Sequence, residues 1–456
     1  MRTRIVTFLA LIMVFSVNAQ NKKWTLLECV EYALENNITI KQQELLTELN
    51  KEDIVIAEGN FYPSLNASAS NNYNFGSYIG QSGNRISRDS RSVGFGLNTG
   101  FNIYNGSRNK LTLQQAKKSL EAAGFDLQEN KNNIMLFVVN SYLNVLLNRE
   151  ALVIAQDQIG ISQNQVDKAT GLVEAGEQPR TVVLEAEATL ATNLQQLTTA
   201  QNNLDLSLLS LAQLLQLPHD GFDVANVDLT IDSASLIYND TDDIYSKAVA
   251  SLPEIKSAEI AVENSDLSVK IAKSRYLPSL SFGAGLGSSY QHSQGQKDVR
   301  PMLDPDTNEI VLVPNGFGQQ IEDNLGYNFG FSLSIPIFNR FQTKSGLTRA
   351  EINHQRTELA LLDKQIKLRE SIERAYADAK ASLKQFVSAE VSLNAQQEAF
   401  KNAQESYNSG VMTSFDFDQV RNRLVNAQST MVNAKYNFVF RTKLLEYYYG
   451  IPIVIE

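Results

Sequence analysis

Apolar and small polar residues alternate in four short segments of the chain. The segments cover residues 64–75, 93–103, 279–287 and 325–335. In the second segment, apolar residues such as Phe95 and Leu97 alternate with Gly94, Gly96 and Asn98. A period of two places successive side chains on opposite faces, so each segment is predicted to be a β-strand with one apolar and one polar face.

Such strands fit two environments, a water-soluble sandwich or a membrane-spanning barrel. Three observations favour the barrel. The polar face has almost no Lys or Glu, each run has about 9 to 13 residues, and aromatic residues cluster near the strand ends. These aromatic residues are Phe61, Tyr62, Tyr73, Phe75, Tyr104, Tyr276 and Phe338.

Four strands cannot close a barrel alone, because closed membrane barrels have about 8 strands or more. Several chains must therefore share one barrel. Two chains would supply eight strands and an interior filled by side chains, whereas three chains would supply twelve strands and an open lumen.

Two proline-free stretches, residues 107–173 and 343–408, are predicted to be very long helices. At about 1.5 Å per residue each would span roughly 100 Å, whereas the mean globular helix has only about 11–12 residues. The segments that follow keep alternating three- and four-residue apolar steps, which is typical of coiled-coil packing; an ordinary soluble helical bundle is the simpler alternative. The positions are Leu190, Leu197, Ala200, Leu204, Leu211 and Leu214, with Asn193 and Ser207 in polar slots, and Val420, Leu424, Ala427, Met431, Ala434 and Phe438.

Each long helix is followed by a tight turn that leads into the next helix. In the first turn, Gly176 follows the helix and Pro179 is expected in the first turn of the next one. In the second turn Gly410 has the same place, and Thr413 or Ser414 is expected to cap the following helix. These turns are the predicted tips of two helical hairpins.

The chain repeats its own plan. Phe61–Leu65 recurs as Tyr276–Leu280 with an offset of 215, and later matches, such as Asn105 with Asn339, keep an offset of 234. The difference is one insertion of 19 residues between the two strands of the second copy. The predicted organisation is a signal peptide at 1–19, repeat 1 at 20–218, a linker at 219–237 and repeat 2 at 238–456.

The predicted signal peptide has a positive start and an apolar middle. Arg2 and Arg4 precede an apolar run up to Val17, and small residues offer a cleavage site before Gln20. No later run of roughly 18 apolar residues predicts a membrane-spanning helix. The single cysteine, Cys29, excludes a disulfide framework and is expected to be a small buried residue. The formal net charge of −10 argues against nucleic acid as a partner.

The sequence offers no candidate site for enzyme chemistry. The three histidines, His219, His292 and His354, are not spaced with other ligands as a metal site requires. Gly94-Phe95-Gly96 is strand alternation and not a phosphate-binding loop. No catalytic activity, cofactor or metal is therefore expected.

The signal peptide, the duplicated unit and the glycine-tipped hairpins together resemble the TolC-like outer-membrane efflux protein family. The resemblance covers essentially the whole mature chain. Its marks are the Pro-Ser-Leu entries into the first strand of each copy, the exits Ile103–Asn105 and Ile337–Asn339 into the long helices, and the tip Tyr407–Gly410 followed by Thr413 and Asp416. The resemblance implies an α+β membrane protein, a homotrimer with a 12-stranded β-barrel in the outer membrane of a Gram-negative bacterium and a helical coiled-coil tunnel in the periplasm.

The resemblance also implies a function. The protein would be a passive exit duct for small toxic molecules, served by an inner-membrane pump of the proton-driven RND type and a periplasmic adaptor protein. The barrel would contact outer-membrane lipid, and the hairpin tips at Gly176, Gly410 and Thr413 would face the adaptor. The segments 77–91 and 288–323, which link the strands away from the helices, would be extracellular loops.

A periplasmic gate is expected at the second tip. In the family, carboxylates just beyond this tip line a constriction, and Asp416 stands at the matching position. The family's second aspartate is replaced by Gln419, with Asp418 next to it. Three copies of Asp416 around an axis would attract cations and repel anions. The alternative is that Asp416 is only a solvated carboxylate favoured by the helix dipole.

The polar latch of this gate is expected to differ from the family pattern. Tyr407 matches a tyrosine that ties neighbouring hairpins together in the closed state. The arginine that helps this tie is replaced by Met412, and its acidic partner is replaced by Val182. The latch is therefore predicted to be weaker or differently built.

Two other functions fit parts of the pattern. The duct could serve type I protein secretion or metal efflux, because the pump selects the cargo. A soluble exported coiled-coil scaffold or adhesin would also use long hairpins, but it would have to bury the aromatic face of the strands inside protein.

Overall fold

The computed structural model describes residues 22–87, 89–227 and 240–451. The predicted signal peptide and residues 228–237 of the predicted linker lie outside the described residues. The chain divides into two compact units. Of the described residues, unit 1 contains 22–47, 122–227, 240–259 and 360–451, and unit 2 contains 48–87, 89–121 and 260–359.

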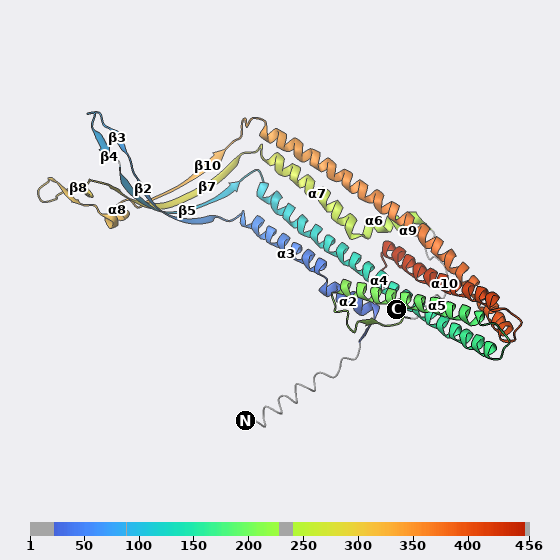
Figure 1. Ribbon diagram of the computed structural model, residues 1–456. Helices are drawn as coiled ribbons and strands as arrows, with labels where there is room; N and C mark the ends of the chain where they lie inside the picture. The colour runs from blue at the N-terminus through green and yellow to red at the C-terminus, as the bar shows by residue number, and fades with distance from the viewer. Residues whose placement is uncertain (1–21, 88, 228–239, 452–456) are drawn as a thin grey trace, which may run out of the picture. The chain divides into compact units, whose positions relative to one another are not determined.

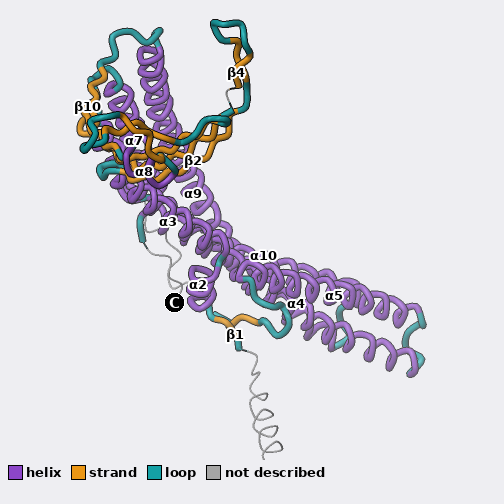
Figure 2. Tube along the Cα trace, turned by 90° about the vertical axis from the view of Figure 1, so that its left-hand side faces the viewer, coloured by secondary structure: helices purple, strands orange, loops and turns teal. Residues whose placement is uncertain are grey.

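Long helices make up most of the described chain (Figures 1 and 2). The helices are α2 (Leu26–Asn36), α3 (Ile38–Gly59), α4 (Arg108–Glu174), α5 (Thr181–Leu215), α6 (Thr241–Ser251), α7 (Pro253–Ser274), α8 (Phe317–Asp323), α9 (Gln342–Asn408) and α10 (Ser414–Tyr449). The strands are β1 (Lys23–Trp24), β2 (Ser64–Asn74), β3 (Ser77–Ile79), β4 (Arg85–Ser87), β5 (Ser90–Tyr104), β6 (Asp223–Val224), β7 (Ser279–Ser293), β8 (Val299–Leu303), β9 (Ile310–Pro314) and β10 (Gly326–Ser334). The two predicted long helices are confirmed to within one residue at each end.

The two halves of the described chain contain the same order of main elements. Helices α2 and α6 each have 11 residues, α3 and α7 each have 22, and α4 and α9 each have 67. The four predicted strands correspond to β2, β5, β7 and β10. Both halves therefore place two strands between a short helix pair and a long helical hairpin.

The segments predicted as loops, 77–91 and 288–323, contain regular secondary structure that the sequence analysis did not predict. The first segment contains the β3–β4 hairpin. In the second, β7 continues to Ser293 and is followed by the β8–β9 hairpin and helix α8. The Pro, Asp and Asn residues between β8 and β9 form the turn of a hairpin, and the apolar residues on either side form its strands.

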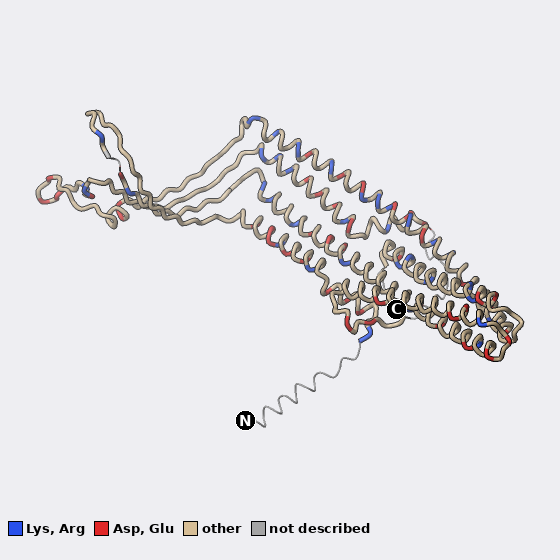
Figure 3. The backbone as a smooth tube through the Cα atoms, in the orientation of Figure 1, with Lys and Arg blue, Asp and Glu red and all other residues tan. Residues whose placement is uncertain are grey.

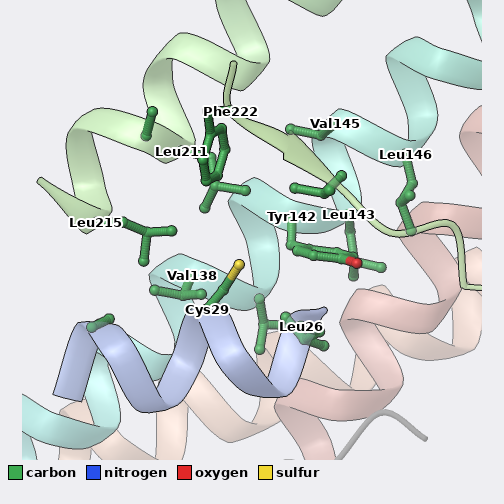
Figure 4. Packing of buried hydrophobic residues seen from close by; sticks show 14 of the residues in the cluster. Leu26, Cys29, Val138, Tyr142, Leu143, Val145, Leu146, Leu211, Leu215 and Phe222 are labelled. Atoms are coloured by element: carbon green, nitrogen blue, oxygen red, sulfur yellow. The ribbon is translucent and has the colours of Figure 1, made fainter. Parts of the chain in front are cut away.

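Unit 1 has its main core where α2, α4, α5 and β6 meet (Figure 4). Tyr142 is fully buried, and its hydroxyl lies 2.7 Å from the Ala225 carbonyl oxygen and 3.2 Å from that of Trp24. Cys29 packs into the same core with no exposed surface, which confirms the expected buried cysteine. Phe222 is also buried here, so the described part of the predicted linker packs on the helices.

The coiled-coil pattern of the return helices is confirmed by burial. In α5 the predicted residues Asn193, Leu204, Ser207 and Leu211 are buried. The other predicted positions, Leu190, Leu197, Ala200 and Leu214, are half-buried. In α10 the predicted seam residues Val420, Leu424, Ala427, Ala434 and Phe438 are buried, and Met431 is partly buried. The seam also includes Arg421, which the apolar pattern did not predict.

Unit 2 contains an antiparallel sheet with the strand order β10-β7-β5-β2. The register aligns Phe101, Phe282 and Phe331 in one row, with ring centroids 5.7 and 5.2 Å apart. The opposite face has rows of small polar residues; in one row Gly285 lies between Asn98 and Asn328. A Cβ atom on Gly285 would lie 2.8 Å from the Asn328 side chain, so the polar face is closely packed at this point.

The helices of unit 2 contact one another in the same order as the strands to which they are connected. Lys117 of α4 pairs with Glu58 of α3 at 3.9 Å, and Lys118 of α4 pairs with Glu263 of α7 at 2.9 Å. A Ser265–His354 hydrogen bond of 2.7 Å joins α7 to α9. Among the described residues, none of the helices has an apolar stretch long enough to cross a membrane.

Candidate functional site

The two hairpin tips of unit 1 begin with the same backbone turn. At the end of α4, the Gly176 N–H donates to the Val173 carbonyl at 3.0 Å, and the Glu177 N–H donates to the Leu172 carbonyl at 2.9 Å. The end of α9 makes the same two bonds around Gly410. Both glycines have φ +76, a left-handed conformation that other L-residues adopt only at a cost.

The second tip continues into a capped helix. The Thr413 side chain accepts a hydrogen bond from the Asp416 N–H at 3.2 Å and donates one to the Asp416 carboxylate at 2.7 Å. Thr413 is therefore the N-cap of α10, one of the two residues predicted for this role. The Asp416 carboxylate is exposed and lies in the first turn, where the helix dipole favours a negative charge.

The first tip lacks this arrangement. Helix α5 begins at Thr181, and its N-cap Arg180 makes no side-chain capping bond. The prediction that Pro179 lies in the first helical turn is wrong, because Pro179 precedes the helix and its carbonyl accepts the Val182 N–H at 3.1 Å. Only the second tip therefore presents a carboxylate fixed by a cap.

An aromatic cluster lies behind the second tip. The Tyr407 ring stacks on Phe417 with 4.7 Å between centroids, and Phe400 lies 5.5 Å from Phe417. Lys168 of α4 donates to the Tyr407 carbonyl at 2.6 Å, and its Nζ atom lies 4.0 Å from the Tyr407 ring centroid. Met412 also packs against this cluster. The cation at this tip thus comes from the other hairpin.

A buried polar network joins the hairpins next to this cluster. Arg421 of α10 donates to Gln165 Oε1 of α4 at 2.6 Å and lies 3.4 Å from the Ser162 hydroxyl. Its other Nη atom lies 3.1 Å from Asp418 Oδ1, which also accepts a bond from Gln165 at 2.9 Å. Asn193 of α5 donates to Ser162, so three helices contribute to the network.

Burial sets the electrostatics of the network. The Arg421 side chain is 3 % exposed and that of Asp418 is 27 % exposed. Burial lowers the pKa of the Arg421 guanidinium, and the Asp418 carboxylate opposes that change. Burial also raises the pKa of the Tyr407 hydroxyl, and the Asp418 charge adds to the rise. A buried arginine with one carboxylate and an amide partner depends on keeping all of these contacts.

The structure separates two residues that the sequence grouped together. Asp418 belongs to the buried network, whereas Asp416 bonds only within its own helical turn. Sequence reasoning missed Arg421 and Gln165. The available signal was the three-residue spacing of Asp418 and Arg421 beside the seam residue Val420. In the described part of the chain, no group of His, Cys, Asp and Glu residues could hold a metal ion.

Comparison with known proteins shows the family to which the chain belongs. A family model described as outer membrane efflux protein matches residues 29–216 and 244–442. The outer membrane efflux protein BepC of Brucella suis biovar 1 (strain 1330) is 21% identical over 418 residues, which cover 91% of this chain and 83% of BepC. The outer membrane protein TolC of Escherichia coli (strain K12) is 24% identical over 345 residues, which cover 72% of this chain and 63% of TolC.

Solved structures match this chain in fold. The Campylobacter jejuni CmeC outer membrane channel aligns with a TM-score of 0.74 and 19% sequence identity. The alignment covers 96% of this chain and 87% of CmeC. The family model covers most of the chain in two segments, one on each long hairpin and the elements before it. The chain belongs to the outer membrane efflux protein family.

Proposed function

We propose that three copies of this chain form a passive outer-membrane exit duct of a tripartite efflux system. The observation that supports this most is the open sheet of unit 2. Its edge strands β2 and β10 each pair with a single strand within the described chain. Closing the sheet with two further copies would satisfy both edges and give a barrel of twelve strands.

The exposed aromatic face supports a membrane setting. Tyr327, Phe329 and Phe331 of β10 are 84, 73 and 68 % exposed. Their face continues across the sheet through Phe282 and Phe101. Leaving such a face in water would be unfavourable, whereas outer-membrane lipid would cover it and the Ser, Asn and Gly face would line a wet lumen. The two halves of the chain, which have the same element order, would then supply six similar units around one axis.

The two outer helices of unit 2, α3 and α9, each expose apolar side chains. Helix α3 leads into β2, and its residues Leu49 and Ile56 are 61 and 66 % exposed. Helix α9 follows β10, and its residues Ile352 and Leu359 are 51 and 65 % exposed. Pairing α3 of one copy with α9 of the next would bury both apolar surfaces, in the same order as β2 with β10.

The hairpin tips are the proposed gate. Three Asp416 carboxylates would form an acidic ring, and the network around Asp418 and Arg421 would hold the two hairpins of each copy together in the closed state. Tyr407 would contribute through its stack on Phe417 and its contact with Lys168. The latch would thus use a buried pair in place of the family's arginine at position 412.

The partners follow from this arrangement. A periplasmic adaptor would contact the tips at Gly176, Gly410 and Thr413, and an inner-membrane pump of the proton-driven RND type would supply the energy. The pump would select the cargo, which we propose to be small toxic molecules. The duct itself needs no cofactor.

Two measurements test the duct. Native mass spectrometry of detergent-purified protein should give a mass of three chains. Planar-bilayer recording should give small closed-state currents that increase when the tip network is broken. A monomeric protein without conductance, even with the tip opened by mutation, would rule out the duct.

A further inference from the structure

The two loops at the end of the sheet away from the helices carry opposite charge. The segment 77–91 contains three arginines and one aspartate. The segment 288–323 contains six carboxylates and two basic residues (Figure 3). The carboxylates are those of Asp298, Asp304, Asp306, Glu309, Glu322 and Asp323. Opposite charges on two surfaces of one chain suit contact between copies.

The acidic segment is a folded surface. Gln320 of α8 is buried, and its side chain accepts the Gln291 N–H of β7 at 2.9 Å and donates to the Asn315 carbonyl at 2.8 Å. The Arg300–Asp323 ion pair of 2.7 Å joins β8 to α8. The β8–β9 hairpin and α8 are therefore fixed to the end of β7. We call this assembly, residues 294–323, the acidic cap.

Among the described residues, one arginine of the first loop and four carboxylates of the acidic cap have no partner of opposite charge. The Arg85 guanidinium of β4 donates to the Ser77 hydroxyl at 2.7 Å, and the described residues provide it with no carboxylate. Four carboxylates of the acidic cap have no Lys or Arg partner in the described part of the chain. They are those of Asp304, Asp306, Glu309 and Glu322.

Both loops also expose apolar side chains. Ile79 of the β3–β4 hairpin is 75 % exposed, and Ile310 and Leu312 of the acidic cap are 73 and 68 % exposed. Isolated two-stranded hairpins are only marginally stable, and burying these residues would add to their stability. The two surfaces are thus complementary in charge and both present apolar area.

The strand order would bring these surfaces together in neighbouring copies. The sheet is antiparallel throughout, so β2 of one copy can pair with β10 of the next. Only two residues separate Asn74, the end of β2, from Ser77, and two separate Asp323 from Gly326, the start of β10. Paired strands lie about 4.8 Å apart, so the β3–β4 hairpin would emerge beside the neighbour's α8.

We propose that the β3–β4 hairpin of each copy docks on the acidic cap of its neighbour. Three such contacts form a ring at the outward mouth of the duct, where the Arg85 charge faces the unpaired carboxylates. The ring holds the mouth together independently of the strand pairing below it. The proposal rests on the trimer of the proposed function and adds a second interface to it.

Paired cysteines test the contact. Ser77→Cys and Gly318→Cys place thiols at two exposed positions and keep Arg85 and the four carboxylates, and the native Cys29 is fully buried and does not compete. Treatment of the double variant with a short bismaleimide should yield covalent trimers on a denaturing gel. Each single variant, treated in the same way, should remain monomeric.

A charge variant tests the recognition. Adding Arg85→Glu to the cysteine pair should lower the cross-linking yield about two- to five-fold, the range expected for an exposed ion pair. Adding Arg85→Lys should preserve the yield. An unchanged yield with Arg85→Glu would exclude recognition by charge.

Native mass spectrometry of the same samples separates the two proposals. A trimer that gives no cross-link, or only an intrachain one, overturns the ring and leaves the duct intact; the hairpins would then face lipid or another protein. A monomeric mass overturns the proposed function itself.

Discussion

The Arg421 Nη1 atom lies 2.6 Å from Gln165 Oε1, and this bond connects helix α10 of the second hairpin to helix α4 of the first. The same guanidinium lies 3.1 Å from Asp418. Because Arg421 is almost fully buried, these partners replace its hydration. The two hairpins are therefore joined by a contact whose loss leaves polar groups without partners.

Replacing Arg421 should open the tip. Arg421→Met keeps much of the side-chain volume but leaves Asp418 and Gln165 without the guanidinium, at a cost of about 1–3 kcal/mol in stability. We expect larger single-channel conductance or a higher open fraction in planar bilayers, together with a lower melting temperature.

The matched control is Arg423→Met, two residues further along α10, where the side chain is exposed. Its effect on stability should stay within about 0.5 kcal/mol. If Arg421→Met folds and conducts like the original protein, the network does not latch the hairpins.

Two variants at the start of α10 should separate the effect of the Asp416 charge on cation block from the effect of the Thr413 cap on stability. Asp416→Asn keeps the size of the side chain but removes its charge, so block of the channel by divalent cations should weaken. Thr413→Ala removes the capping hydroxyl and keeps the carboxylate, so it should cost about 1 kcal/mol in stability and leave cation block unchanged. Bilayer recordings with increasing Mg²⁺ compare the two variants. Equal loss of block in both would show that helix capping, and not an acidic ring, underlies the effect.

Sequence reasoning located the elements whose signal is periodic. The long helices, the two-faced strands and the glycine turns at Gly176 and Gly410 follow from spacing and local chemistry, which act over a few residues. The burial of Arg421 depends on contacts with α4, more than 250 residues earlier, so its charge alone indicated a solvated position. The acidic cap was missed because short strands rich in turn residues resemble loops until their pairing is known.

Cys29 should be unreactive in the folded protein. Burial raises the pKa of its thiol from the usual value near 9 to about 12. A thiol reagent at pH 8 should therefore label the protein only after unfolding. The thiol has a higher pKa in the folded state than in the unfolded state. Between about pH 9 and pH 12 the thiol is therefore ionised in the unfolded chain but still protonated in the folded protein. The free energy of unfolding falls over this range by up to about 1.4 kcal/mol per pH unit.

Chemical denaturation at several alkaline pH values would measure this dependence. In Cys29→Ala the contribution of the thiol should disappear, although the protein becomes less stable at every pH because a side chain is removed from the core. Rapid labelling of the folded protein at pH 8 would show that unit 1 opens around α2 far more often than its packing suggests.

A side chain at Gly410 should destabilise the turn because of the backbone conformation and not because of a steric clash. A Cβ atom at Gly410 would meet no other atom within 4 Å, but the residue has φ +76. Gly410→Ala should therefore destabilise the tip by roughly 1–2 kcal/mol, the cost of a left-handed conformation. Hydrogen exchange should become about five-fold faster or more in the amides that this turn orders.

The helical Gly346 of α9 provides the opposite control, since a Cβ atom there also meets nothing within 4 Å. Gly346→Ala should stabilise its helix by about 0.5–1 kcal/mol and slow local exchange, because alanine loses less backbone freedom on folding. Slower exchange at the tip in Gly410→Ala would mean that the turn adopts another conformation in solution. Faster exchange confined to the second tip would show that its glycine sets the stability of the proposed gate.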